Sequence, residues 1–384
     1  MRIDTLQFDD LQADWHLDEV HFDSINLLVG ASAVGKTRIL NSLERLKNLT
    51  ILNHHSGSMR WRLRFSHDGK SYQWEGETAA PPKQSDFIHP EIPLFGAPSS
   101  ELVSERLTSE STVFEREGDR FVFGEQALPK LSRAVSAMKL LNQEPRVQQP
   151  VLGLFRILFS DAAAVKPFDI AEAQLTEQMQ SWSSLKDNPD TFRPFGAAQL
   201  GPATVLLAYI LQEVFPTEFE RWKQAFIGVF PAIKDLQVVA SKGLLPSMVR
   251  LTIAARESGV GRWIPQTEMA SGMLKTLVHL LEMRVVPAGS VIVVDEFENG
   301  LGVNCMPAVV DLLSERSGDI QYILTSHHPY VINQLPWQTW KLVRRTGNRV
   351  TVTSARDLSG MKPASHLDAF TRLINLPEYE ESIR

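Results

Sequence analysis

Short apolar runs that end abruptly in polar or glycine residues occur near both ends of the chain. Ile25–Val29 ends at a glycine, Val291–Val294 ends at two acids, and Ile323–Leu324 leads into Thr-Ser-His-His. Runs of this length are typical of strands buried on both faces of a parallel sheet. Because residues 303–314 between the last two runs have a helical pattern, strand and helix alternate here, which predicts a parallel α/β sheet.

The region between these runs has a different pattern. Residues 59–75 and 111–124 alternate in polarity around the turn signals 66–70 and 117–119, which predicts two antiparallel hairpins. Five prolines within 81–98 predict an irregular connection. The remaining patterns predict strands at 2–8, 20–30 and 233–264, mostly helix over 128–230, helices at 273–285 and 366–374, and a strand pair at 340–345 and 349–354.

These elements predict an α/β fold with a mixed or parallel central sheet, an antiparallel β subdomain and a helical insertion. We expect three parts. Residues 1–98 form the N-terminal half of the main domain, 99–265 an inserted helical and β lobe, and 266–384 the C-terminal half.

Composition excludes several classes of protein. The 384 residues are 43% hydrophobic and 22% charged, which is ordinary for a globular chain. The net charge of −6 argues against a molecule that is basic all over. The single cysteine, Cys305, leaves no internal disulfide, and the longest apolar stretch, 203–210, is too short to span a bilayer. With no apolar run at the N-terminus, we expect a cytoplasmic protein that does not enter membranes.

The segment that follows the first apolar run reads GxxxxGK[ST], a phosphate-binding loop. A strand, a glycine-containing loop and a helix N-terminus together direct backbone N–H groups and the helix dipole at an anion. We expect a nucleoside triphosphate to be bound here, with Lys36 at the β- and γ-phosphates and the Thr37 hydroxyl on Mg²⁺. The residues expected at the nucleotide are Gly30, Ala31, Ser32, Ala33, Val34, Gly35, Lys36 and Thr37.

Polar residues at the ends of the other two buried runs are the candidates for chemistry. Asp295 suits the Mg²⁺ shell, and Glu296 suits orienting and deprotonating the attacking water. His327 is expected to reach the γ-phosphate, in preference to His328, which we expect to face away. The carboxyl ends of parallel strands are where α/β sheets place ligand sites.

A turn of small residues, Met269 to Met273, precedes the helix predicted at 273–285. Its Ser271 and Gly272 are candidates for a second anion site at a helix N-terminus. An ordinary helix cap has the same local chemistry, so the sequence leaves both interpretations open.

The order of these motifs resembles the ABC-type ATPase heads of the RecF, SMC and OLD-like group, which includes many bacterial AAA-type ATPases. The resemblance rests on GASAVGKT, MASGM, VIVVDE, ENGL and TSHHPYVIN, and it covers about residues 1–45 and 265–336. Ser32 and Ala33 stand where the group usually has Asn and Gly, and Ala270 stands at the usual signature serine. Asn299 falls in the D-loop region of the group.

The resemblance implies a P-loop NTPase head that works as a homodimer or a higher even oligomer. Two heads would sandwich two ATP molecules, each bound by the loop of one chain and the signature turn, Ser271-Gly272, of the other. Hydrolysis at Glu296 would release the dimer. The 48 residues after Pro336 are too few for a nuclease domain. The resemblance therefore implies a separate effector, a nuclease or toxin, in anti-phage defence or DNA maintenance.

Two alternatives stay open. One is a RecF-like clamp on DNA or RNA, for which Arg60, Arg62 and Arg64 on one strand face, or three cations on one predicted helix, Lys130, Arg133 and Lys139, are candidate contacts. The same arginines also fit an ordinary solvated face. The other is a nucleotide-sensing head with little turnover, which Ala270 favours. A transporter ATPase is disfavoured, because the signature turn and the DEFENGL segment of this chain differ from those of transporter heads.

Overall fold

The computed structural model divides the chain into two compact units, Met1–Ile157 with Ile323–Arg384 and Leu158–Tyr322. Each unit is described by itself. The expected division at 98/99 and 265/266 stays a prediction. None of the described helices combines the length and apolar character needed to cross a bilayer. The structure describes all residues except 53–56, 80–99, 161–164, 184–199, 300, 303–304, 360, 362–365, 376–378 and 380–384.

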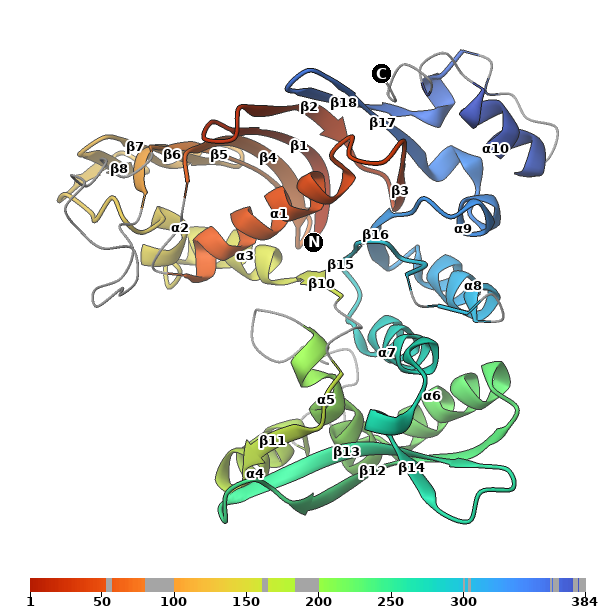
Figure 1. Ribbon diagram of the computed structural model, residues 1–384. Coiled ribbons are helices and arrows are strands. Elements are labelled where there is room, and N and C mark those ends of the chain that lie inside the picture. The colour runs from red at the N-terminus through yellow and green to blue at the C-terminus, as the bar shows by residue number, and fades with distance from the viewer. Residues whose placement is uncertain are drawn as a thin grey trace, which may run out of the picture. The chain divides into compact units, whose positions relative to one another are not determined.

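Unit 1 is built on a mixed sheet (Figure 1). Its order is β3-β17-β18-β2-β1-β4-β5-β6-β7-β8-β9, with the C-terminal half of β16 beside β3. β17 runs parallel to β3 and β18 parallel to β2, while the neighbours from β2 to β9 are antiparallel. The strands are β1 (Arg2–Asp10), β2 (Trp15–His21), β3 (Ile25–Val29), β4 (Met59–His67), β5 (Lys70–Ala79), β6 (Glu101–Thr108), β7 (Thr112–Glu117), β8 (Arg120–Phe123), β9 (Gln126–Leu128), β16 (Ile320–Thr325), β17 (Trp340–Thr346) and β18 (Arg349–Ser354).

Helices of unit 1 cover this sheet. Helix α1 (Lys36–Ile51), α2 (Ala137–Leu140) and α3 (Pro145–Phe155) lie on one face of it (Figure 1). Helix α9 (Pro329–Gln334) and α10 (His366–Ile374) lie near β17. Both predicted hairpins are confirmed as β4–β5 and β7–β8, and so is the strand pair β17–β18.

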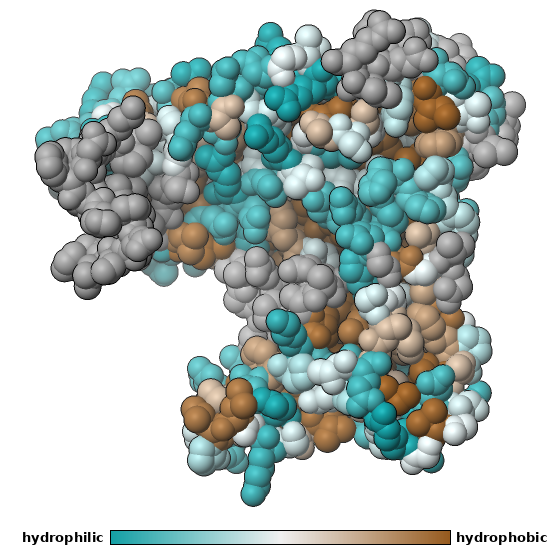
Figure 2. Space-filling model, viewed as in Figure 1, coloured by the Kyte–Doolittle hydropathy of each residue, from teal (hydrophilic) through white to brown (hydrophobic). Residues whose placement is uncertain are grey.

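The outer face of β4 carries the three alternating arginines, and each pairs across the sheet. Arg60 contacts Glu77 at 2.8 Å and Arg62 contacts Glu75 at 3.0 Å, while Arg64 donates to an amide oxygen. The intervening side chains of β4 are buried. The arrangement is that of a solvated outer face, and Figure 2 shows mostly hydrophilic side chains over the visible surface of unit 1.

The loop between β3 and α1 has an unusual backbone. Gly30, Ala33 and Gly35 have φ angles of 148°, 66° and 111°, in the region that side chains disfavour. All five residues of β3 are buried. The buried Val34 fixes the middle of the loop, and Ala33 beside it is exposed.

Unit 2 combines a second sheet with a group of helices. β11 (Phe168–Ala171), β13 (Met248–Glu257) and β12 (Ile233–Lys242) form an antiparallel sheet, joined at β13 by β14 (Trp263–Pro265). Helices α4 to α6 pack on it, and α7 packs on α5 and α6 (Figure 1). β15 lies between β10 and β16. The further bounds are α4 (Glu172–Ser183), α5 (Leu200–Val214), α6 (Pro216–Val229), α7 (Ser271–Val285), α8 (Met306–Arg316), β10 (Ile157–Phe159) and β15 (Ser290–Val294).

The continuous strand predicted before the phosphate loop is wrong. The strand expected at 20–30 is the end of β2 and all of β3, because Asp23 and Asn26 form a turn in which the Asp23 N–H donates to Asn26 Oδ1 at 2.7 Å. The irregular connection expected at 81–98 lies outside the described residues.

The helix expected to carry Lys130, Arg133 and Lys139 is absent, since only Lys139 lies in a helix, α2. Lys130 instead pairs with Asp119 at 2.6 Å, and the Arg133 guanidinium donates to the Leu102 carbonyl. Ser136 begins α2 by accepting a hydrogen bond from the Met138 N–H.

His67 at the end of β4 gives unit 1 a pH dependence. It is 8% exposed, its Nδ1 finds no hydrogen-bond partner among the described residues, and burial lowers its pKa to about 4. The unfolded chain takes up this proton near the ordinary value of 6.5, so the free energy of unfolding falls as pH decreases from 6.5 to 4. We expect His67→Leu to lose less thermal stability than the wild type over this window in circular dichroism melts. Equal losses in both proteins would contradict it.

The positive φ of Ala33 predicts a second effect on stability. A residue with a Cβ at φ 66° is strained by roughly 1–2 kcal/mol, so Ala33→Gly should raise the free energy of unfolding by up to about 1 kcal/mol. The matched control is Ala31→Gly in the same loop, where φ is not positive, and it should lower that free energy by about 0.4–1 kcal/mol. Urea denaturation measures both, and a loss in both variants would show that Ala33 is unstrained.

Candidate functional site

The phosphate loop in unit 1 depends on a close approach between backbones. A Cβ placed on Gly30 would lie 2.5 Å from the Val343 carbonyl oxygen of β17, so only glycine fits. Gly35 is the N-cap of α1, and no side chain caps that helix end. An uncapped helix N-terminus beside a glycine cradle fits a phosphate. These observations match the nucleotide expected from the sequence.

Lys36 and Thr37 occupy the first two positions of α1. The Lys36 ammonium donates to the carbonyl oxygens of Gly30 and Ala31, both at 2.8 Å, so it lies across the loop. Thr37 is exposed beside it, as is Ser32. All the residues expected at the phosphates from 30 to 37 therefore lie together in one turn.

The two histidines after β16 have different positions. The Ser326 N–H donates to the Leu28 carbonyl of β3 at 3.4 Å, which brings the start of this segment to within two residues of Gly30 in unit 1. His328 begins α9, and its Nδ1 accepts a hydrogen bond from the Tyr330 N–H at 3.2 Å. His327 is exposed. The capping role of His328 leaves His327 as the candidate for the γ-phosphate, and that role stays a prediction.

The two acids lie in unit 2 at the end of β15. All residues of β15 are buried, while Asp295 and Glu296 are exposed. Glu296 has a φ of 45°, which is rare for a residue with a side chain. Backbone strain of this kind clusters at functional sites. The geometry supports a chemical role for Glu296, although the structure does not relate the acids to the loop in unit 1.

Asn299 and Lys275 are contacts of this turn that the sequence did not identify as functional. Asn299 Nδ2 donates to Glu296 Oε2 at 3.1 Å, and its backbone N–H donates to the Glu296 carbonyl at 2.7 Å. The Lys275 ammonium of α7 donates to the Asn299 carbonyl. The sequence placed Asn299 in the D-loop region of the related heads without giving it a contact, and no signal pointed to Lys275.

The signature turn lies at the start of α7 in the same unit. Helix α7 begins at Ser271, two residues before the predicted start, and Ala270 is its N-cap without a side-chain hydrogen bond. Ser271 is exposed, and the Thr276 hydroxyl donates to the Gly272 carbonyl at 2.7 Å. The helix cap therefore falls on Ala270, in the turn before Ser271, and the anion site at this helix end stays a prediction.

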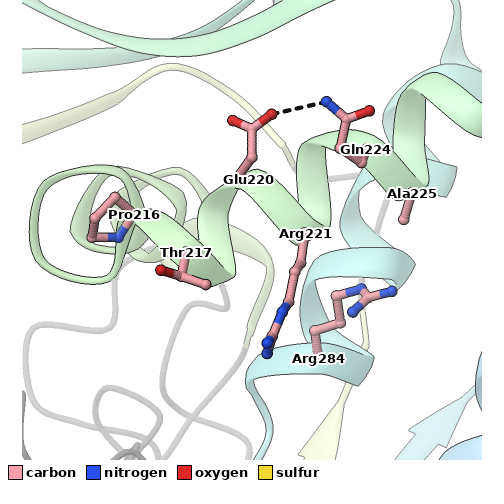
Figure 3. A pocket seen from close by; sticks show the side chains of 7 residues that line it. All are labelled: Pro216, Thr217, Glu220, Arg221, Gln224, Ala225 and Arg284. Carbon is pink, nitrogen blue, oxygen red and sulfur yellow. Dashed lines mark hydrogen bonds between the residues drawn. The ribbon is translucent and has the colours of Figure 1, made fainter.

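A pocket of about 730 Å³ lies elsewhere on unit 2, between α6 and α7. Figure 3 shows Arg221 of α6 and Arg284 of α7 on its wall, with Glu220 and Gln224 joined by a hydrogen bond. None of its lining residues is a predicted site residue.

Within the described ranges, no three His, Cys, Asp or Glu side chains gather to form a metal cage. Mg²⁺ at a nucleotide usually takes one or two protein oxygens and completes its shell with phosphates and water. The hydroxyl of Thr37 and the carboxylate of Asp295 are oxygen donors of this kind, so their chemistry fits the ion expected from the sequence.

Comparison with solved structures shows the fold. The structure titled "Crystal structure of the SmcHead bound to the C-winged helix domain of ScpA" is similar with a TM-score of 0.50 and 13% identity, over 94% of this chain and 99% of that chain. An Smc head with an extended coiled coil from Pyrococcus furiosus has a TM-score of 0.48 and 11% identity over 92% and 96% of the two chains. The SMC head domain from Thermotoga maritima has a TM-score of 0.38 and 11% identity, over 92% of this chain and 99% of that chain.

The likeness to the first of these structures shows that the chain has the fold of an SMC head, with the P-loop and the mixed sheet described above. No curated protein matches the chain. One family model matches residues 25–333, which include the phosphate loop, the signature turn, the two acids and His327. The chain thus belongs to the family described as "AAA domain, putative AbiEii toxin, Type IV TA system", and it is an ABC/AAA-type ATPase head.

Proposed function

We propose that this chain binds ATP with Mg²⁺ and hydrolyses it, that two copies close around the nucleotides, and that this cycle controls a separate effector protein. The observation that carries the proposal is Glu296, an exposed acid in a strained conformation directly after a buried strand, in a chain with an intact phosphate loop. Family membership supports the nucleotide chemistry.

The residues of the loop would bind and orient the nucleotide. The N–H groups at the start of α1 and the Lys36 ammonium face phosphate oxygens, with Lys36 exchanging its loop carbonyls for them. Thr37 and Asp295 would hold the magnesium ion. When bound, Mg²⁺ neutralises phosphate charge and polarises the bond to the γ-phosphate.

Glu296 would act as the general base. Its carboxylate accepts a hydrogen bond and then the proton of the attacking water, while His327 stabilises charge at the γ-phosphate. A base that points into solvent in an open head needs the second copy to exclude bulk water. For this reason we place hydrolysis in the closed dimer.

Closure would use the start of α7 from the second copy. Exposed Ser271 and the N–H groups behind it form an anion site without a capping side chain, and they would contact the γ-phosphate held by the first copy. Ala270 lacks the hydroxyl that the related heads offer there, so Ser271 would supply it.

The effector is proposed from two relatives. The family's description names a toxin–antitoxin system, and the similar SMC head is bound to a domain of another protein, ScpA. A nuclease or toxin partner in cytoplasmic defence or DNA maintenance fits both. The RecF-like clamp has weaker support, because the arginines on β4 are paired with side chains of β5. A steep salt dependence of DNA affinity would favour the clamp.

Gly30→Ala tests the loop. The added methyl group meets the Val343 carbonyl at 2.5 Å, so the loop must shift, and we expect ATP affinity to fall by roughly 100-fold, equal to about 2.7 kcal/mol. Titration with a fluorescent ATP analogue measures this. The matched control is Gly228→Ala on α6, where a Cβ meets nothing within 4 Å, and its affinity should equal that of the wild type. Unchanged affinity of Gly30→Ala would remove the loop from the site.

Glu296→Gln tests hydrolysis and closure together. Loss of a general base should lower kcat by about 100-fold or more while ATP affinity changes little. Because hydrolysis opens the dimer, the variant should also accumulate as an ATP-bound dimer in analytical ultracentrifugation. Turnover equal to wild type would show that Glu296 is not the base. A wild type that binds ATP and shows no turnover would instead support the slow sensing head.

A further inference from the structure

We infer that Asn299 is a positioning residue for Glu296 and that Lys275 ties Asn299 to the signature helix, so that α7 couples partner contact to the catalytic base. The inference rests on the proposed function, since it assigns how that base is held. It is carried by one chain of hydrogen bonds within unit 2, from α7 through Asn299 to the Glu296 carboxylate.

The side chain of Glu296 needs neighbouring contacts to fix its orientation. It is exposed, so packing does not restrict its side chain, and its φ of 45° costs backbone energy that neighbouring contacts must offset. Asn299 contacts it twice, with the side-chain amide on Oε2 at 3.1 Å and the backbone N–H on the carbonyl at 2.7 Å. The backbone contact closes the turn, and the side-chain contact orients the carboxylate.

Helix α7 supports this turn at two points. Lys275, one helical turn after Ser271, donates to the Asn299 carbonyl. His279, one turn further, lies against Phe297 with ring centroids 5.6 Å apart, and both side chains are at least 97% buried. Phe297 and Asn299, both in the turn 296–299, therefore contact the same face of α7.

The far half of α7 is fixed in unit 2, which makes the helix a rigid element. Buried Glu282 accepts a hydrogen bond from Ser160 at 2.6 Å, and Ser160 also donates its backbone N–H to the Val293 carbonyl of β15. The Trp222 indole donates to the Leu277 carbonyl at 3.0 Å. We therefore expect a displacement of the start of α7 to move Asn299 as well, because Lys275 joins the two and the packed helix shifts as one unit.

The coupling has a direction. In the proposed dimer, the signature turn of one copy contacts the nucleotide of the other copy, whereas its Glu296 serves its own nucleotide. The chain from Lys275 to Glu296 then makes the base of each site respond to the nucleotide in the opposite site. This is a coupling free energy between two identical sites.

Substitutions at Asn299 test the positioning role. Asn299→Ala and Asn299→Asp should each lower kcat roughly tenfold and leave KM for ATP within about twofold, because the contact acts on the base and not on ATP. Asn299→Asp keeps the size of the side chain, removes the donor and adds a negative charge beside Glu296, so the neutral Asn299→Ala must also lose turnover for the loss to reflect the missing hydrogen bond. Turnover of Asn299→Asp equal to wild type, in a protein whose Glu296→Gln variant is inactive, would overturn the inference and leave the proposed function standing.

Hydrogen exchange of the nucleotide-free full chain tests the tie to α7 without any hydrolysis. Peptides covering 295–302 should exchange several-fold faster in Lys275→Met, and Lys275→Arg should restore wild-type exchange because it keeps a donor. The matched control is Lys234→Met, which removes another lysine bond to a backbone carbonyl, that of Pro231, away from α7. Exchange at 295–302 that is the same in Lys275→Met and wild type would overturn the coupling even if ATP turnover is normal.

Discussion

The contact between Gly30 and the Val343 carbonyl is the constraint on which the phosphate loop depends. β3 and β17 run parallel and in register from Leu27 to Val29, so the chain leaves β3 directly against the backbone of its neighbour. With no Cβ at Gly30, the loop can turn there, bury Val34 and start α1 at Lys36 with its N–H groups directed outward. A side chain at that point would push the loop away from β17 and move the helix start with it.

Much of the fold follows from local patterns, and so it could be predicted from the sequence. Alternation in β4 separates buried Trp61 and Leu63 from exposed Arg60 and Arg62, and a hairpin satisfies that pattern wherever it lies. The buried strands β3 and β15 were recognisable because each is wholly apolar or nearly so, and because β3 stops at a glycine and β15 at two acids. The nucleotide loop was predicted because its chemistry lies in consecutive residues.

Features that depend on contacts distant in sequence could not be predicted in this way. In the segment expected as a helix around Lys130, Lys130 binds Asp119 and Arg133 binds the Leu102 carbonyl, which no pattern in the segment indicates, and the first helix begins only after Ser136. The role inferred for Asn299 depends on the turn in which Glu296 has a φ of 45°, and that of Lys275 depends on its hydrogen bond from α7 to the Asn299 carbonyl. The sequence match of Asn299 to the D-loop region does not indicate its contact with Glu296, and Lys275 is an ordinary helix lysine in the sequence.

The departures from the related heads act on different steps of the proposed cycle. Ala33 strains the loop in unit 1, and that strain bears on how readily the loop adopts its binding shape. Ala270 removes a hydroxyl from the start of α7, which bears on how tightly the second copy is held. Neither touches Glu296, whose contacts with Asn299 are intact. In the proposed cycle, weak closure combined with an intact base would make dimer formation, and not chemistry, the step that limits turnover. In such a head the tie between α7 and Glu296 matters most, because it restricts an active base to the brief period in which the partner is engaged.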